Sequence, residues 1–127
     1  MARMMERLLD SVILIDHLNG IEKATTFIAS LNPDKSAISV ITRAEILVGL
    51  DSGKNDKVKA LLDQYHTFII DKDVADAAAD LRKKFHWKLP DAFQAAICVQ
   101  NKLKLATRNS KDFDPDKHPF VEIPYTL

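Results

Sequence analysis

The chain has 127 residues, of which 46% are hydrophobic and 28% are charged. This is enough to bury one domain core and is typical of a globular protein in water. Its 18 basic and 18 acidic residues cancel, so net charge gives no reason to expect nucleic acid, although a neutral total can hide local patches. We recognise no targeting or membrane-spanning segment and expect a cytoplasmic protein with one domain over residues 1–127. Cys98, in an apolar run, is expected to be a buried core residue.

Short apolar runs typical of strands alternate along the chain with stretches of helical periodicity. We expect strands ending at Leu9 and over residues 36–40, 67–70, 103–107 and, weakly, 120–123. Helices are expected over residues 21–31, 42–50, 58–65, 71–85 and 90–99, while residues 12–18 fit either a strand or a helix. The alternation predicts an α/β fold with a parallel sheet covered on both faces. In such sheets, functional sites form outside the carboxyl ends of the strands.

Asp10 lies in the apolar stretch 8–16. A buried carboxylate is costly unless it finds hydrogen-bond donors, a cation or a proton. Two interpretations are open: Asp10 is the N-cap of a helix that begins near Val12, or it belongs to a functional site. Asp16 lies roughly one and a half helical turns further on, too far to share an ion with Asp10 without a bend.

Three further acids occupy comparable positions in the predicted fold. Glu45 is expected in the first turn of the helix after the second strand, Asp91 in the first turn of the most apolar helix, and Asp112 just beyond the fourth strand. Each also has a purely structural interpretation. Thr42 and Glu45 have the spacing of a capping box, Asp91 is a favourable acid near a helix start, and Asp112 fits a solvated turn.

The four carboxylates converge if the strand ends share one edge of the sheet. Like charges that close cannot all stay ionised without a counter-ion, and an all-oxygen set suits magnesium or manganese. Zinc is not expected, because the histidines lie on different segments and no cysteine stands at zinc-ligand spacing. Residues 112–116 begin like a calcium loop, but the required glycine and final acid are missing.

Four segments of the chain resemble the ordered motifs of PIN domains and, more narrowly, of VapC toxins from bacterial and archaeal toxin–antitoxin pairs. They are LLDSVILID (8–16), SVITRAEILVGL (39–50), LPDAFQAA (89–96) and ATRNSKDF (106–113). The resemblance covers nearly the whole chain. It implies a PIN-like domain with a five-stranded parallel sheet between helices and a magnesium- or manganese-dependent endoribonuclease. It also implies a homodimer and a small VapB-like antitoxin that covers the site.

The resemblance also implies roles for individual residues. The residues that carry over by motif position are the metal-binding and catalytic acids Asp10, Glu45, Asp91 and Asp112, with Ser11 and Asn109 as supporting polar residues. This chain departs from many relatives at Val12, where they have asparagine. This difference affects what can be expected of the exact positions of side chains in the site, but it does not affect the assignment of the four acids.

A ribonuclease needs a positive surface for RNA, because phosphate contacts dominate affinity. Residues 82–88 combine basic side chains with Trp87, which could stack on a base. The alternative is a solvated helix end with Trp87 packed in the core. Arg43 and Arg108 flank the acids and are equally good candidates for phosphate contact.

Two other functions are compatible with parts of this pattern. A receiver-type phosphoacceptor domain could use Asp71 as the acceptor, but Ser11 and Val12 follow Asp10 where an adjacent acidic pair is needed. A PIN-like domain that binds a partner without cleaving RNA also fits, although the complete set of four acids argues against it.

Overall fold

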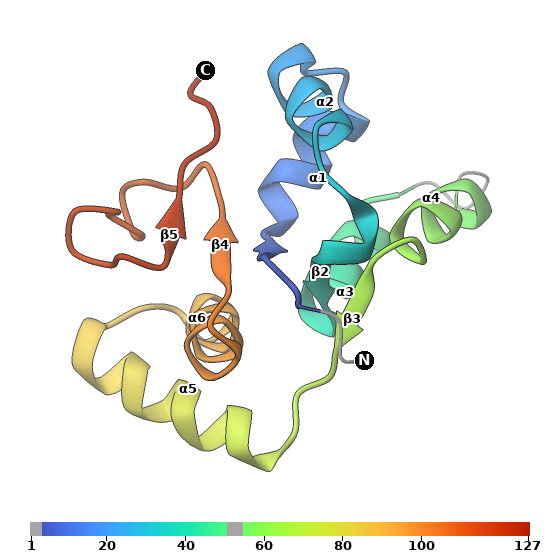
Figure 1. Cartoon of the computed structure of the whole chain (residues 1–127). Coiled ribbons are helices and arrows are strands. Elements are labelled where there is room, and N and C mark those ends of the chain that lie inside the picture. The colour runs from blue at the N-terminus through green and yellow to red at the C-terminus, as the bar shows by residue number, and fades with distance from the viewer. Residues whose placement is uncertain (1–3, 51–54) are drawn as a thin grey trace.

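The computed structural model describes residues 4–50 and 55–127. Its strands form one parallel sheet in the order β3-β2-β1-β4-β5 (Figure 1). The strands are β1 (Arg7–Leu9), β2 (Ser36–Ser39), β3 (His66–Phe68), β4 (Lys104–Ala106) and β5 (Val121–Glu122). The helices are α1 (Ser11–Leu18), α2 (Glu22–Ala29), α3 (Val40–Val48), α4 (Asn55–Leu62), α5 (Lys72–Phe85) and α6 (Leu89–Asn101), with a 3-10 turn η1 (Pro33–Lys35).

Helices cover both faces of this sheet, because successive residues of a strand point to opposite sides. Leu8 of β1 packs with α5 and α6 in one apolar cluster, whereas the next residue, Leu9, packs with α1, α3 and α4 in another. Cys98 of α6 is fully buried in the first cluster, as predicted. The predicted α/β fold, with five parallel strands between helices, is therefore confirmed.

The starts of α1 and α3 show which conformation residues 12–18 adopt and which residue caps the helix that carries Glu45. Residues 12–18 are helical, and Asp10 is the N-cap of α1, since its Oδ1 accepts a hydrogen bond from the Ser11 backbone N–H at 2.9 Å. Helix α3 begins at Val40, two residues before the expected start, because the Ser39 hydroxyl oxygen accepts from the Thr42 backbone N–H at 3.2 Å. The predicted capping box of Thr42 and Glu45 is therefore wrong, and Glu45 lies in the second turn.

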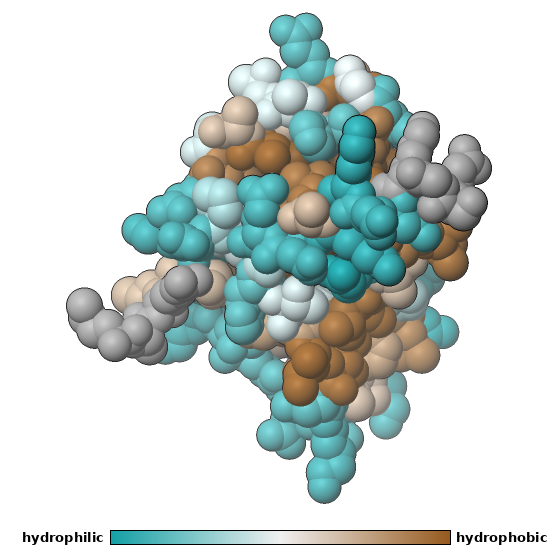
Figure 2. All heavy atoms as spheres, turned by 90° about the vertical axis from the view of Figure 1, so that its right-hand side faces the viewer, coloured by the Kyte–Doolittle hydropathy of each residue, from teal (hydrophilic) through white to brown (hydrophobic). Residues whose placement is uncertain are grey.

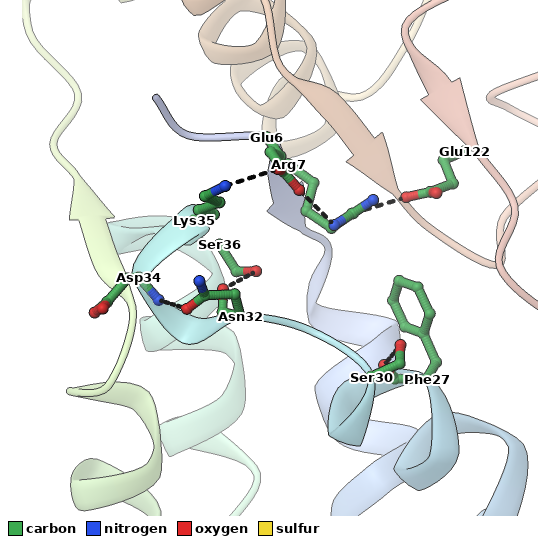
Figure 3. Close-up of polar contacts among 9 residues, drawn as sticks. All are labelled: Glu6, Arg7, Phe27, Ser30, Asn32, Asp34, Lys35, Ser36 and Glu122. Carbon is green, nitrogen blue, oxygen red and sulfur yellow. Dashed lines mark hydrogen bonds and ion pairs between the residues drawn. The ribbon is translucent and has the colours of Figure 1, made fainter. Parts of the chain in front are cut away.

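Partly exposed ion pairs tie the start of β1 to its surroundings (Figure 3). The Arg7 Nε lies 3.1 Å from a Glu122 carboxylate oxygen of β5, and Lys35 of η1 lies 3.6 Å from Glu6. Exposed pairs of this kind each contribute at most about 1 kcal/mol. They align neighbouring elements without contributing groups to the carboxyl edge of the sheet.

The strand order argues against the receiver interpretation. Receiver-type doubly wound sheets have the order 2-1-3-4-5, which differs from the order found here. Asp71, the residue that would accept the phosphoryl group, is instead the N-cap of α5 and accepts from the Val74 backbone N–H at 2.9 Å. Within residues 4–50 and 55–127, no helix is long and apolar enough to cross a membrane.

Candidate active site

A cleft of about 470 Å³ opens at the carboxyl edge of the sheet. Asp10 follows β1, Glu45 lies on the helix after β2, and Asp91 lies in the first turn of α6, so that all three line this cleft. The parallel arrangement explains the convergence, because it brings the carboxyl ends of all strands to one edge. The supporting residues Ser11 and Asn109 also line the cleft, whereas Asp112 lines a neighbouring one.

Asp10 is the most firmly held of the predicted acids. Only 8% of the residue is exposed. Its Oδ2 accepts a hydrogen bond from the Thr107 hydroxyl at 2.8 Å, and its Oδ1 accepts from the Ser11 backbone and, at 3.4 Å, from the Gln94 side-chain amide. The carboxylate thus caps α1 and faces the cleft at the same time. The two interpretations of Asp10 do not compete.

Sequence reasoning missed the importance of Gln94, which is 2% exposed. Its Oε1 accepts from the Ser39 hydroxyl, and its Nε2 donates to the Thr42 hydroxyl oxygen at 2.9 Å as well as to Asp10. Gln94 lies one turn after Asp91 on α6. Its side chain therefore connects α6, the end of β1 and the start of α3, and each of these elements carries or adjoins one of the predicted acids. The available clue was a single amide in the otherwise apolar run 92–99.

Asp91 experiences the other carboxylates most strongly. Its pKa is raised from 3.8 to about 6, mainly by burial and further by the negative charges of Asp10, Asp112 and Glu45. Asp91 therefore lies close enough to the other three acids to be repelled by each of them. A bound cation would relieve this repulsion, as a proton does.

Glu45 lies at the more open side of the cleft. Although the residue as a whole is exposed, partial burial of its carboxyl group raises the pKa, and the charge of Asp10 raises it further. A hydrogen bond with the Ser11 side chain opposes this rise. A carboxylate with a raised pKa is better suited to accept a proton near neutral pH.

Asp112 is held by two neighbours, of which Asn109 lines the cleft and Trp87 does not. The Asn109 side-chain amide donates to its Oδ2 at 2.9 Å, and the Trp87 indole N–H donates to its backbone carbonyl at 2.8 Å. Helix α5 is followed by its C-cap residue His86, which has a left-handed φ of 62°, and the next residue, Trp87, is buried against Phe113. Packing of Trp87 in the core is confirmed, so its ring presents no open face for a base.

The carboxylates of the cleft can be compared with what a bound divalent ion requires. Across the described part of the chain, no three His, Cys, Asp or Glu side chains are arranged to hold one ion together. Magnesium, however, keeps several waters and usually takes only one or two protein carboxylates. Asp10 and Asp91 both line the cleft and supply oxygen donors of the kind that this binding mode requires.

The two arginines that flank the acids differ in position. Arg43 points to an exposed ion pair with Asp63, at 2.8 Å, and does not line the cleft. Arg108 lines the cleft and forms two hydrogen bonds with Asp16, at 2.7 and 3.0 Å. Tyr125 donates to the same carboxylate at 2.8 Å. The hydrogen bond from Arg108 holds the pKa of Asp16 below its ordinary value, despite burial.

Comparison with known proteins places this geometry in context. The family model described as "PIN domain" matches residues 7–115. Ribonuclease VapC10 of Mycobacterium tuberculosis is 31% identical over 108 residues, covering 80% of this chain and 81% of the relative.

Solved structures agree with this. A toxin–antitoxin complex from Klebsiella pneumoniae matches with a TM-score of 0.89 and 33% identity, covering 96% of this chain and 100% of that one. FitAcB from Neisseria gonorrhoeae matches with a TM-score of 0.78 and 25% identity, covering 94% and 99%. The fold is thus shared with these two solved structures over most of their length.

Proposed function

Because the chain belongs to the PIN-domain family, we propose that it is a magnesium- or manganese-dependent endoribonuclease and the toxin of a toxin–antitoxin pair. The observation that carries the proposal is the cleft in which Asp10, Glu45 and Asp91 meet, with the pKa of Asp91 raised by its neighbours. The ribonuclease activity in the name of the Mycobacterium relative supports it.

The residues of the chain have separate roles in this proposal. Asp10 and Asp91 would hold the divalent ion, which when bound supplies an acidified water and neutralises charge on the phosphate. The Glu45 carboxylate would take a proton from the attacking water, for which its raised pKa is favourable. Asn109 holds the Asp112 side chain in place at 2.9 Å, and Gln94 and Thr107 orient Asp10.

The proposed partners are RNA, a small VapB-like antitoxin and a second copy of this chain. The Klebsiella match is to a toxin–antitoxin complex, which supports an antitoxin here. Apolar side chains gather in two patches, separated by polar ones, on the face shown in Figure 2. Large apolar residues are also well exposed at Val48 and Ile69. Patches of this kind often mark protein interfaces.

One observation favours a second candidate, a PIN-like binding module that does not cleave RNA. It is the lack, among the described residues, of three metal-ligand side chains arranged around one point. The two candidates differ in a single measurable property, which is metal-dependent cleavage.

The test is cleavage of a pool of labelled single-stranded RNA oligonucleotides by the purified protein. We expect cleavage with Mg²⁺ or Mn²⁺, none in EDTA, and a loss of at least about 100-fold in Asp91→Asn. The matched control is Asp80→Asn, because Asp80 is an exposed acid on α5 away from the cleft. Cleavage that persists in EDTA, or that Asp91→Asn leaves intact, would contradict the metal mechanism, and no cleavage under any condition would favour the binding module.

A further inference from the structure

The cleft presents a charge problem to an RNA substrate. Its lining includes the carboxylates of Asp10, Glu45 and Asp91, and phosphates are negatively charged. Binding therefore needs positive groups beside the acids. Among the described residues that line the cleft, the basic ones are Arg108 and Lys111, both on the loop after β4.

Arg108 is held in a fixed orientation. Its Nε and Nη2 both donate to the Asp16 carboxylate, which is only 6% exposed and is also bound by the Tyr125 hydroxyl. The Arg108 side chain itself keeps 33% of its surface exposed and lines the cleft, whereas Asp16 does not. A guanidinium fixed on one side and open on the other loses little conformational freedom when it binds an anion.

This geometry differs from that of an ordinary surface ion pair. Arg43 pairs with Asp63, whose side chain is 65% exposed, and neither lines the cleft. Lys111 lines the cleft but is exposed, with a long flexible side chain. Arg108 is therefore the cation that the fold itself places opposite the carboxylates.

We propose that Arg108 binds a backbone phosphate of the RNA in the cleft, in the orientation set by Asp16 and Tyr125. The inference rests on the proposed function and adds to it a phosphate subsite beside the acids. Guanidinium groups suit this role, because their planar donors match two phosphate oxygens at once. The site would recognise any RNA sequence equally, since a phosphate contact carries no base information.

The test measures RNA binding by fluorescence anisotropy in Asp91→Asn protein with EDTA, so that the probe, a fluorescein-labelled single-stranded RNA oligonucleotide, stays intact. The dissociation constant is determined over a series of KCl concentrations. Each phosphate contact contributes about 0.7 to the slope of log Kd against log KCl concentration for a single-stranded nucleic acid. When Arg108→Gln is added to the Asp91→Asn protein, we therefore expect this slope to decrease by about 0.7 and the dissociation constant to rise.

Two further variants distinguish the loss of a phosphate contact from a change in net charge and from a loss of stability. Arg43→Gln removes one positive charge outside the cleft and should leave the slope at the parent value. Arg108→Gln leaves the buried Asp16 carboxylate without its cation, so that only the Tyr125 hydroxyl still donates to it, and this lowers thermal stability. The double change Asp16→Asn/Arg108→Gln removes both charges, retains the net charge of the parent, and should still lose the same slope.

The outcomes are distinct. An unchanged slope in the double variant, or an equal decrease in Arg43→Gln, would overturn the phosphate subsite and leave the proposed function standing. A parent protein that binds no RNA at all would contradict the proposed function, and the subsite with it.

Discussion

The acidic site has a buried half and an exposed half, and they are built differently. In the buried half, Asp10 is bound by Thr107 and Gln94, and Gln94 is bound in turn by Ser39 and Thr42. All five residues are at most 8% exposed. In the exposed half, Glu45 and Asp112 are open to solvent, and the Asp112 carboxylate is held by the side chain of one loop residue, Asn109.

The two halves differ in whether the acid side chains have one orientation before a ligand binds. Buried polar groups are costly if any partner is lost, so a satisfied buried network keeps one geometry. Exposed acids are screened and can change rotamer at little cost. We infer that the fold fixes Asp10 before any ligand arrives, whereas Glu45 and Asp112 adjust to what enters the cleft.

The strongest test of this contrast is to neutralise one acid from each half. Asp10→Asn should lower metal-dependent cleavage by more than about 100-fold, and Asp112→Asn by about tenfold, because an adjustable acid reached through water is more easily replaced. Single-turnover cleavage rates with Mg²⁺ measure both. Thermal melts of each variant check that the fold is retained. Equal losses would show that the two halves do not differ in function.

A second test removes the centre of the buried network without touching an acid. Gln94→Leu leaves Ser39, Thr42 and Asp10 each short of a hydrogen bond, which should cost about 1–3 kcal/mol of unfolding free energy. Cleavage should fall by roughly 10–100-fold, as is typical when support for a metal ligand is lost. Urea unfolding and cleavage rates provide the two measurements.

The matched control is Gln100→Leu on the same helix. Gln100 is exposed, and its side-chain amide donates only to the Asp73 backbone at 3.2 Å. Its replacement should change stability by less than about 0.5 kcal/mol. If Gln94→Leu behaves like this control, the buried network has no positioning role.

The two halves also differ in how far the sequence predicts them. The strands and the shared edge follow from local patterns: Leu8 and Leu9 alternate between the two faces, and parallel strands must end together. All four acids were therefore expected at one edge, and three of them line one cleft. The start of α3 was misplaced, because Ser39 and Thr42 are both good caps and only the fold selects Ser39.

The partners in the buried half could not be predicted, because they are distant in sequence. Gln94 reaches Ser39 across 55 positions and Asp10 across 84. The same is true outside the buried half, where Tyr125 meets Asp16 across 109 positions. No local pattern specifies such pairs. They depend on the order of strands in the sheet, which brings the ends of β1 and β4 side by side.

The smallest expected effect concerns Asp91, which is partly buried. A carboxyl pKa raised from 3.8 to about 6 means that the folded state binds the proton more tightly than the unfolded state. The stabilisation is complete below pH 3.8 and is lost as the pH rises towards 6. The side-chain amide of the Asp91→Asn variant does not titrate. In EDTA, the melting temperature of the variant minus that of wild type should therefore rise by a few degrees as the pH rises from 3.8 to about 6. At higher pH this difference should stay constant.

Thermal melts at a series of pH values, at low ionic strength, measure this difference. Adding Mg²⁺ at neutral pH should raise the wild-type melting temperature and leave the variant nearly unchanged, because a ligand stabilises only the state that binds it. A difference that does not vary with pH would mean that Asp91 does not feel the other carboxylates.

The pairing of β1 with β4 at the middle of the sheet also has a consequence for protein synthesis. Asp10 leaves the ribosome before Thr107, whose hydroxyl holds it and which follows 97 positions later. Domains form from the amino end as the chain emerges, and contacts between distant segments must wait for both partners. The cleft therefore cannot assemble on a nascent chain that ends before β4. The activity proposed for this cleft is therefore gained only late in synthesis, once Thr107 has emerged to hold Asp10.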